Sequence, residues 1–240
     1  MVALRRKSRV GLATVVLVMG LPFAAQSADP AETKPFSAEL TVVSDYIYRG
    51  VSLSDGHVAF QASAAWNNAH ASVLPGLHSD AWFSTIDFGD SDPAEVELAG
   101  TIGYSGGHRV TYDLGLTYTA YPGVAHYDYV EAYGAVGTTL GKATVMASVN
   151  YTPSYSGDTG AATFLDLEGE YALTGVIALV GSIGYADLKP AAGDKYAYWG
   201  LGVKVTYRRF TASVRYHGNS LNGCASACGD GVTASLSRAF

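Results

Sequence analysis

Apolar and polar residues alternate with a period close to two along most of the chain from Phe36 onward. In the first such stretch, Ala38, Leu40 and Val42 share a face with Phe36, whereas Glu39 falls on the other face. Successive side chains of a β-strand point to opposite sides, so this period predicts strands with one apolar and one polar face. No stretch of the sequence has the 3.6-residue period of an amphipathic helix. The pattern therefore predicts an all-β protein.

About twelve alternating stretches follow one another, each roughly 9–13 residues long, which is the length that a tilted strand needs to cross a bilayer. They cover approximately residues 36–49, 58–67, 77–87, 95–104, 109–119, 128–138, 144–152, 163–172, 176–186, 197–207, 210–219 and 231–240. Tight turns, such as residues 105–108, alternate with longer loops rich in Gly, Pro, Ser and Asp, such as residues 50–56. Short turns on one rim, long loops on the other and an even strand number are typical of an antiparallel transmembrane β-barrel.

The direction in which the apolar faces point has to come from another signal, because a soluble β-barrel or β-sandwich alternates in the same way. Aromatic residues of the apolar faces gather at the two strand ends, with small aliphatic residues between them. At the periplasmic rim we expect Phe36, Trp66, Tyr104, Tyr112, Tyr171, Tyr207, Phe210 and Phe240; at the outer rim we expect Tyr46, Tyr48, Phe60, Tyr118, Tyr151, Tyr185, Trp199 and Tyr216. Two aromatic belts favour a barrel embedded in a membrane.

Composition agrees with a membrane barrel. Charged residues make up 15% of the chain and the mean hydropathy is +0.13, whereas about 25% charged residues is usual for soluble proteins. No stretch of about 18 uncharged apolar residues occurs, so membrane-spanning helices are not expected.

Residues 1–28 have the features of a cleaved signal peptide. Arg5, Arg6, Lys7 and Arg9 precede an apolar run over residues 10–25, and small residues follow it. We therefore expect a signal peptide at 1–28, a short N-terminal segment at 29–35 and an outer-membrane barrel at 36–240. Cleavage removes four of 15 basic residues and no acid, which leaves a net charge of −10 and argues against nucleic acid or anionic lipid headgroups as partners.

The polar faces carry the residues that would line a hydrated lumen. Buried in an apolar core, the three carboxylates of Asp166, Glu168 and Glu170 would be very costly, whereas water in a lumen solvates them. The acidic candidates are Glu39, Asp45, Asp80, Glu95, Glu97, Asp113, Glu131, Asp166, Glu168 and Glu170, and the basic candidates are Arg49, Arg109, Lys204 and Arg215. Ten acids against four bases predict a cation-preferring interior.

Several sequence blocks resemble those of the TorF family of proteobacterial porins. They are SDYIYRGVSLSDG at 44–56 with Ala59 and Gln61 after it, WFSTIDFGD at 82–90, YDLGLTYTAYPG at 112–123 and YDYVEAYG at 127–134. The resemblance implies an outer-membrane barrel and a pore, and it supplies neither a substrate nor functional residues. The VLPG sequence at 73–76 and the two cysteines depart from the family pattern.

Three further features concern partners and cofactors. Phe240 ends an amphipathic last strand and resembles the signal read by the barrel-assembly machinery, while Arg238 points toward lipid near the rim, where it can snorkel. Cys224 and Cys228 enter an oxidising compartment and are candidates for a disulfide that stiffens its loop. No metal site and no cofactor are expected. Outer-membrane lipid and lipopolysaccharide are the expected surroundings.

The sequence thus predicts an outer-membrane channel for passive passage of small polar solutes or ions, and not an enzyme. Two alternatives remain. A barrel hydrolase of lipid or lipopolysaccharide would need one of His57, His78, His126 or His217, expected in the outer half, beside a nucleophile. The G-x-S-x-G match at 103–107 lies in a tight turn and not in the strand-to-helix elbow of that motif. A structural or receptor barrel would act through its outer loops.

Overall fold

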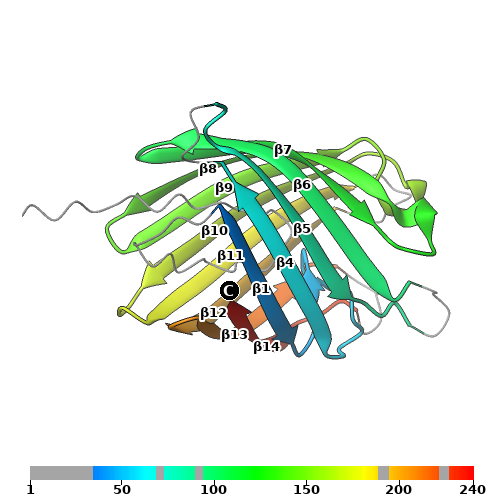
Figure 1. Ribbon diagram of the computed structural model, residues 1–240. Coiled ribbons are helices and arrows are strands. Elements are labelled where there is room, and N and C mark those ends of the chain that lie inside the picture. Colours follow the sequence, from blue (N-terminus) through cyan, green and yellow to red (C-terminus); the bar gives the residue numbers. More distant parts are fainter. Residues whose placement is uncertain (1–34, 69–72, 90–93, 189–194, 222–226) are drawn as a thin grey trace, which may run out of the picture.

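The computed structural model describes residues 35–68, 73–89, 94–188, 195–221 and 227–240. Twelve antiparallel strands form a closed barrel in which β1 pairs with both β4 and β14 (Figure 1). The barrel strands are β1 (Phe36–Val43), β4 (Ala59–Asn67), β5 (Leu77–Thr85), β6 (Val96–Gly107), β7 (Val110–Ala120), β8 (Tyr129–Leu140), β9 (Ala143–Thr152), β10 (Ala162–Ala172), β11 (Ile177–Leu188), β12 (Tyr196–Tyr207), β13 (Phe210–Asn219) and β14 (Gly231–Ala239).

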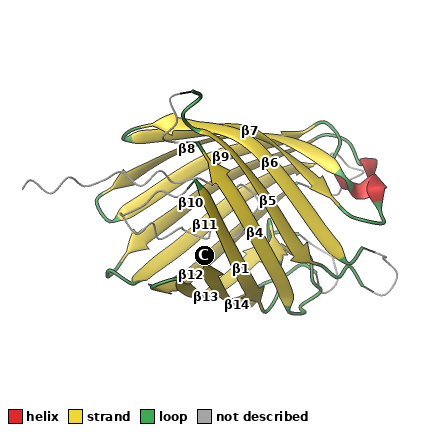
Figure 2. Cartoon of the chain, in the orientation of Figure 1, coloured by secondary structure: helices red, strands yellow, loops and turns green. Residues whose placement is uncertain are grey.

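The remaining elements are short. They are the two-residue strands β2 (Ile47–Tyr48) and β3 (Val51–Ser52) and the 3-10 turns η1 (Ala125–Tyr127) and η2 (Ser156–Asp158) (Figure 2). Within the described residues no helix is both long enough and apolar enough to span a bilayer. The predicted signal peptide at 1–28 lies outside the described residues, so that prediction stays open.

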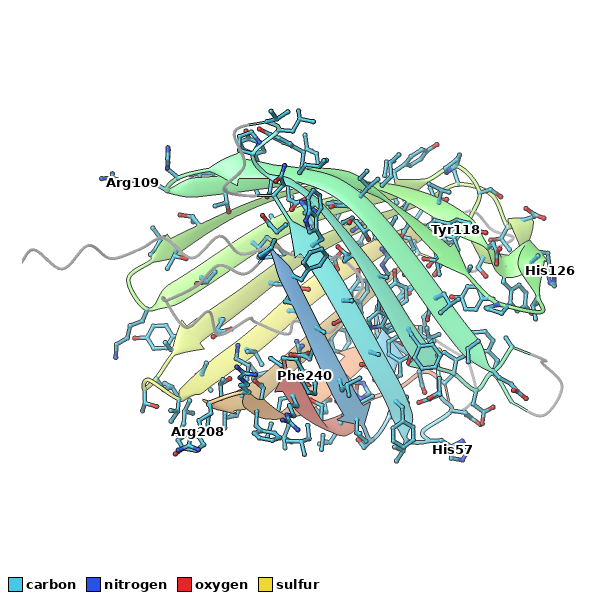
Figure 3. All side chains as sticks on the ribbon, viewed as in Figure 1. His57, Arg109, Tyr118, His126, Arg208 and Phe240 are labelled. Atoms are coloured by element: carbon cyan, nitrogen blue, oxygen red, sulfur yellow. The ribbon has the colours of Figure 1, made fainter. Side chains whose placement is uncertain are left out.

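The two ends of the barrel differ in their connections. At one end, here called the turn end, residues 108–109, 141–142, 173–176 and 208–209 join successive strands in tight turns. At the opposite end, here called the loop end, the longer connections lie. Arg109 and Arg208 mark the turn end in Figure 3, and His57 and His126 mark the loop end. These connections confirm the predicted order of short and long links, except that residues 68–76, which join β4 to β5 at the turn end, form a longer link.

Apolar side chains face out of the barrel, and polar ones face into it. Leu114 is 57% exposed and Leu201 is 64% exposed, whereas Asp113 beside the first is 5% exposed. The same alternation runs along most of β1, β7, β10, β12 and β13. A soluble barrel would bury its apolar face, so the predicted outward orientation of that face is confirmed.

The aromatic belts are also present, with one correction. The predicted residues at the turn end face outward, from Phe36 and Tyr104 to Phe240, and so do Phe60, Tyr118, Tyr151, Tyr185, Trp199 and Tyr216 toward the loop end. Tyr46 and Tyr48, however, do not belong to the outer belt. Tyr46 is only 2% exposed and packs inside the barrel against Trp82, with ring centroids 5.4 Å apart.

The correction arises because the first strand is shorter than its alternation predicts. β1 ends at Val43, and the chain then turns inward as a hairpin made of β2 and β3. Arg49 and Gly50 form its two-residue turn with φ angles of 49° and 80°. Positive φ at both turn positions is the type I′ geometry that suits a tight hairpin, and glycine adopts it without strain.

The inner surface of the barrel carries two apolar clusters toward the loop end. The first includes Tyr46, Trp82, Tyr121 and Tyr129, and the second is built on Phe164, Tyr196 and Tyr198. Tyr155, which precedes η2, packs against both clusters, with its ring 4.9 Å from that of Tyr129 and 5.4 Å from that of Phe164. The loop-end half of the interior is therefore more apolar than a simple polar lumen predicts.

Candidate functional site: the barrel lumen

Most of the predicted lumen residues lie on the inner wall of the barrel. The inward-facing alternation of their strands places them there, and the side chains of the group range from fully buried to half-buried. The group consists of Glu39, Asp80, Glu97, Asp113, Glu131, Asp166, Glu168, Glu170, Lys204 and Arg215.

Three predicted residues lie elsewhere. Arg109 is exposed in the turn before β7, at the turn-end rim (Figure 3). Glu95 is exposed just before β6, at the loop end. Asp45 follows β1 and accepts hydrogen bonds from the hydroxyls of Ser52 at 2.6 Å and Ser54 at 2.9 Å, so it braces the inward hairpin. The alternation has the right phase at these positions, but β1 ends before Asp45, and β6 and β7 begin only after Glu95 and Arg109.

Arg49 lies at the tip of the hairpin and contacts the wall of the barrel. Its Nη1 donates to Glu131 Oε1 at 2.9 Å, and its Nη2 donates to Glu131 Oε2 at 3.2 Å. The guanidinium carbon also lies 3.5 Å from the centre of the Phe164 ring and 4.7 Å from that of Tyr48. The side chains of Arg49 and Glu131 are 7% and 6% exposed, so this bidentate pair is shielded from solvent.

Glu131 keeps Arg49 charged despite its burial. Burial alone would lower the pKa of the Arg49 guanidinium and is the largest single influence on it. The Glu131 carboxylate, together with the neighbouring Tyr48, Tyr129 and Tyr155, outweighs burial, so the pKa lies well above its ordinary value. Arg49 is therefore a permanent cation whose charge Glu131 compensates directly.

The hairpin is fastened to other parts of the barrel as well. Asn219 on β13 donates from Nδ2 to the carbonyl of Gly50 at 2.5 Å. The backbone N–H of Ser52 donates to the carbonyl of Ala227 at 2.8 Å, and that of Asp87 donates to Leu53 at 2.8 Å. These bonds, together with the Arg49 pair, come from several sides of the lumen, so the hairpin spans the interior at the loop end.

Charged and polar side chains on β10 to β13 bond to one another along the wall. Lys204 Nζ donates to Glu170 Oε2 at 2.5 Å. The hydroxyl of Tyr198 donates to Asp166 Oδ1 at 2.5 Å, and Arg215 Nη2 donates to Ser182 Oγ at 3.2 Å. Among the residues that the structure describes, Glu168 forms no ion pair with a lysine or arginine.

His78 lies on β5, across the barrel from β10 to β13 and in the half nearer the turn end. His78 is 1% exposed, and its Nε2 lies 3.3 Å from the hydroxyl of Tyr133 and 3.6 Å from Asp113 Oδ2. Its Nδ1 lies 3.3 Å from the carbonyl of Gly76. The predicted place of His78 in the outer half is wrong, because β5 begins at the turn end.

Gly103 makes room for this contact. It faces inward between His78 and Tyr133, and a Cβ atom there would lie 2.6 Å from His78 Nε2 and closer still to the Tyr133 hydroxyl. The missing side chain lets the Tyr133 ring lie along the wall instead of projecting into the lumen. Tyr133 and Phe164 were not among the predicted lumen residues, although a glycine at an inward position of a strand is a usable signal for such a close approach.

The charges of the described inner wall are unequal. Its arginine and lysine ion pairs join Arg49 to Glu131 and Lys204 to Glu170. Six wall carboxyls have no such ion pair within the described residues: Glu39, Asp80, Glu97, Asp113, Asp166 and Glu168. Arg215 is the remaining arginine or lysine on that wall. The described wall therefore keeps an excess of acidic groups.

The histidine contacts in the described residues are to acids, a carbonyl and a phenol. His57 Nδ1 lies 3.1 Å from Asp87 Oδ2 at the exposed loop end, and His78 contacts Gly76, Tyr133 and Asp113. No group of three His, Cys, Asp or Glu side chains in these parts of the chain is arranged to hold a metal ion.

The predicted cysteine pair is described only in part. Cys228 is disulfide-bonded, and Cys224 lies outside the described residues, so the pairing of the two stays a prediction. Cys228 also forms a β-bridge with Val51 of the hairpin. Ala227 and Cys228 are therefore in direct contact with the hairpin.

Comparison with known proteins concerns both family and fold. The model of a bacterial protein family of unknown function (Gcw_chp) matches residues 27–237. No curated protein matches the chain. A KdgM porin shares the fold with a TM-score of 0.59 at 7% sequence identity, over 85% of this chain and 99% of that chain.

Two more solved structures are similar. A NanC porin has a TM-score of 0.55 at 10% identity, over 85% of this chain and 98% of its own. Outer membrane phospholipase A from Escherichia coli has a TM-score of 0.53 at 12% identity, over 90% of this chain and 94% of that chain. At these identities the likeness concerns the barrel fold alone.

Proposed function

The chain belongs to Gcw_chp, a bacterial protein family of unknown function, and we propose that it forms an outer-membrane channel for passive passage of small polar solutes or ions, with a preference for cations. The protein resides in the outer membrane of a Gram-negative bacterium, surrounded by phospholipid and lipopolysaccharide. The likeness to the TorF family stays a prediction beside this proposal.

The observation that carries the proposal is the inward placement of the charged residues. Acidic side chains from β1, β5, β6, β7, β8 and β10 face the interior, while Leu, Val and aromatic residues face outward. Such a wall solvates ions and polar solutes as they pass, and lipid solvates the outside. The porin-like barrel supports the same role by analogy of fold only.

The cation preference rests on the excess of wall carboxyls. Arg49 pairs with Glu131 and Lys204 pairs with Glu170, so the positive charge of each base is compensated locally. Asp166 and Glu168 stay on β10 without a lysine or arginine ion pair within the described residues. A ring or cluster of carboxylates concentrates cations and repels anions in a narrow channel.

The hairpin at residues 46–52 narrows this channel at the loop end. It reaches β8 through Glu131 and β13 through Asn219, and its Tyr46 packs on Trp82 of β5. In this arrangement solutes pass only where the hairpin and the aromatic residues leave space, and displacement of the hairpin widens the path. At the tip of the hairpin, Arg49 both pairs with Glu131 and packs on Phe164, so the tip stays at the wall as long as the Arg49 charge is compensated.

Planar-bilayer recordings of the refolded mature protein under a salt gradient test the proposal. We expect ion conductance with a reversal potential of the sign for cation selectivity. A clear anion preference would overturn the cation proposal. Absence of conductance, together with no swelling of liposomes in small sugars or amino acids, would overturn the channel itself.

Lipid hydrolysis is the alternative that the similarity to the phospholipase barrel leaves open. His78 has a buried acidic neighbour, Asp113, and lies beside the hydroxyl of Tyr133. Release of fatty acid from phospholipid vesicles, abolished by His78→Ala, would favour the enzyme over the channel.

The C-terminal strand offers a further argument for the proposed location in the outer membrane. Phe240 faces outward at 51% exposure, and its backbone N–H donates to the carbonyl of Ala38 at 2.9 Å, which fastens the C-terminus to β1. We propose that this terminal aromatic residue is the signal for the barrel-assembly machinery. Removal of Phe240 should lower the yield of folded protein in the outer membrane without preventing refolding in detergent.

A further inference from the structure

The outward surface of the described strands carries two charged side chains, Asp187 and Arg238. Asp187 lies toward the loop end, and Lys195 Nζ donates to its Oδ2 at 2.9 Å. Arg238 lies on β14, opposite Leu40 of β1 and Phe210 of β13. Within the described residues Arg238 forms no ion pair with an acidic side chain, so a permanent cation faces the lipid.

Two aromatic rings hold the Arg238 guanidinium in place. Its central carbon lies 4.8 Å from the centre of the Phe240 ring and 5.6 Å from that of Phe210. Contacts of this kind attract a cation to the ring face and limit its side-chain motion. The N–H groups at the edge of the planar guanidinium stay available, and their geometry matches the oxygens of a phosphate.

An apolar groove of about 380 Å³ begins at Arg238 and runs along the outside of the barrel. It lies where the first and last strands meet, and its lining includes Leu40, Val42, Phe60, Phe83 and Leu236. Most of these side chains are about half exposed, so the groove is open to the lipid phase. An elongated hydrocarbon chain fits such a surface.

The height of Arg238 in the membrane identifies the leaflet. Phe210 directly follows the tight turn at residues 208–209, so Arg238 lies near the turn end. In a barrel of this type the short turns face the periplasm. The phosphates of the inner leaflet therefore lie at the level of Arg238, whereas those of lipopolysaccharide lie at the opposite end.

We propose that Arg238 and this groove form a binding site for a glycerophospholipid of the periplasmic leaflet. The guanidinium binds the phosphate, and one acyl chain lies along the groove beside Leu40, Phe60 and Phe83. A headgroup without an ammonium group, such as that of phosphatidylglycerol, leaves its phosphate free for Arg238 and binds more tightly than phosphatidylcholine. The site is separate from the lumen and does not depend on the channel function.

Native mass spectrometry of the refolded full mature chain in detergent tests the site. Added phosphatidylglycerol should stay bound as one retained lipid per barrel, with phosphatidylcholine retained more weakly. Arg238→Gln should lower the apparent affinity for phosphatidylglycerol roughly tenfold, since it removes a charge-assisted contact. Arg238→Lys should restore part of it. Arg109→Gln removes an arginine from the same rim, away from the groove, and should leave binding unchanged.

The groove is tested separately from the charge. Ala62→Phe places a ring in the groove and should lower retention, whereas Ala132→Phe, outward-facing on β8, should not. Heat modifiability on gels confirms that each variant is folded. Equal retention by the wild type, Arg238→Gln and Ala62→Phe would overturn the proposal. Tighter retention of lipopolysaccharide than of phosphatidylglycerol would also overturn it. So would displacement of bound phosphatidylglycerol by inorganic phosphate alone.

Discussion

Arg49 and Glu131 meet inside the barrel through two hydrogen bonds of 2.9 and 3.2 Å, although 82 positions separate them in the chain. One residue comes from a hairpin outside the barrel ladder, and the other comes from the wall. Through this pair, the segment that connects β1 to β4 contacts the inner wall of the barrel and lines part of the lumen. Both side chains are buried, so water cannot easily solvate either charge when its partner is removed.

Loss of the Glu131 charge should release the hairpin. Glu131→Gln leaves Arg49 buried without its counter-charge, which costs about 3–5 kcal/mol, and the hairpin should swing out to hydrate the guanidinium. Single-channel recordings should then show larger or more frequent openings than in the wild type. Glu170→Gln is the matched control, because it breaks the ion pair with Lys204 within the wall and leaves the hairpin in place.

A second variant distinguishes release of the hairpin from general destabilisation. Replacement of both partners by apolar residues, as in Arg49→Met with Glu131→Leu, removes the unpaired charge and keeps the packing on Phe164. The double variant should return to the wild-type conductance. Conductance as high as in Glu131→Gln would show that the ion pair itself, and not the penalty of an unpaired arginine, holds the hairpin.

Neutralisation of a wall acid should reduce cation selectivity. Glu168→Gln removes a carboxylate that lacks an ion pair with lysine or arginine within the described residues, and the reversal potential under a salt gradient should move toward zero. Glu95→Gln also removes one negative charge, but from an exposed position at the loop end, and should shift the reversal potential less. An equal shift in both variants would indicate that overall charge, and not the lumen wall, sets selectivity.

The close approach at Gly103 predicts a difference between two glycines of one strand. Gly103→Ala puts a methyl group 2.6 Å from His78 Nε2 and should lower the free energy of unfolding by about 1–3 kcal/mol. Gly100 faces outward, and a Cβ atom added there would meet nothing within 4 Å, so Gly100→Ala should be neutral or slightly stabilising. Urea unfolding in detergent, followed by tryptophan fluorescence, measures both. Equal losses would contradict the packing described around Tyr133.

The cysteine loop should act on the hairpin more than on the barrel. Ser52 donates to Ala227, and Val51 bridges to Cys228, so a looser loop withdraws support from β3. Cys228→Ser should increase channel openings and leave the thermal unfolding of the barrel nearly unchanged, because the predicted disulfide closes only a short loop. A large fall in barrel stability with unchanged openings would contradict this role.

The strands of the barrel were predictable because their signal is local. Alternation with a period of two, as in Leu114 and Leu116 around Gly115, is written into neighbouring residues, and the outward face follows from the aromatic residues at strand ends. The prediction failed at Tyr46 and Tyr48, where the alternation continues but the strand does not. An aromatic residue facing lipid and one packed beneath a loop have the same local pattern.

The inward course of the hairpin depends on distant partners. Arg49 meets Glu131 and Phe164, and nothing near Arg49 in the sequence identifies either of them. The turn itself had a local signal, since Arg49-Gly50 between Ile47-Tyr48 and Val51-Ser52 is a possible two-residue hairpin. Glu95 and Arg109 were misplaced for a simpler reason, because alternation does not mark the residue at which a strand ends.

The most direct test of a water-filled polar lumen compares neighbouring positions on β9. Ser148 faces inward and Ala147 faces outward, so Ser148→Cys should react with a charged, membrane-impermeant thiol reagent in reconstituted protein and change the ion current, while Ala147→Cys should do neither. Reaction and current change at Ala147→Cys but not at Ser148→Cys would contradict the account.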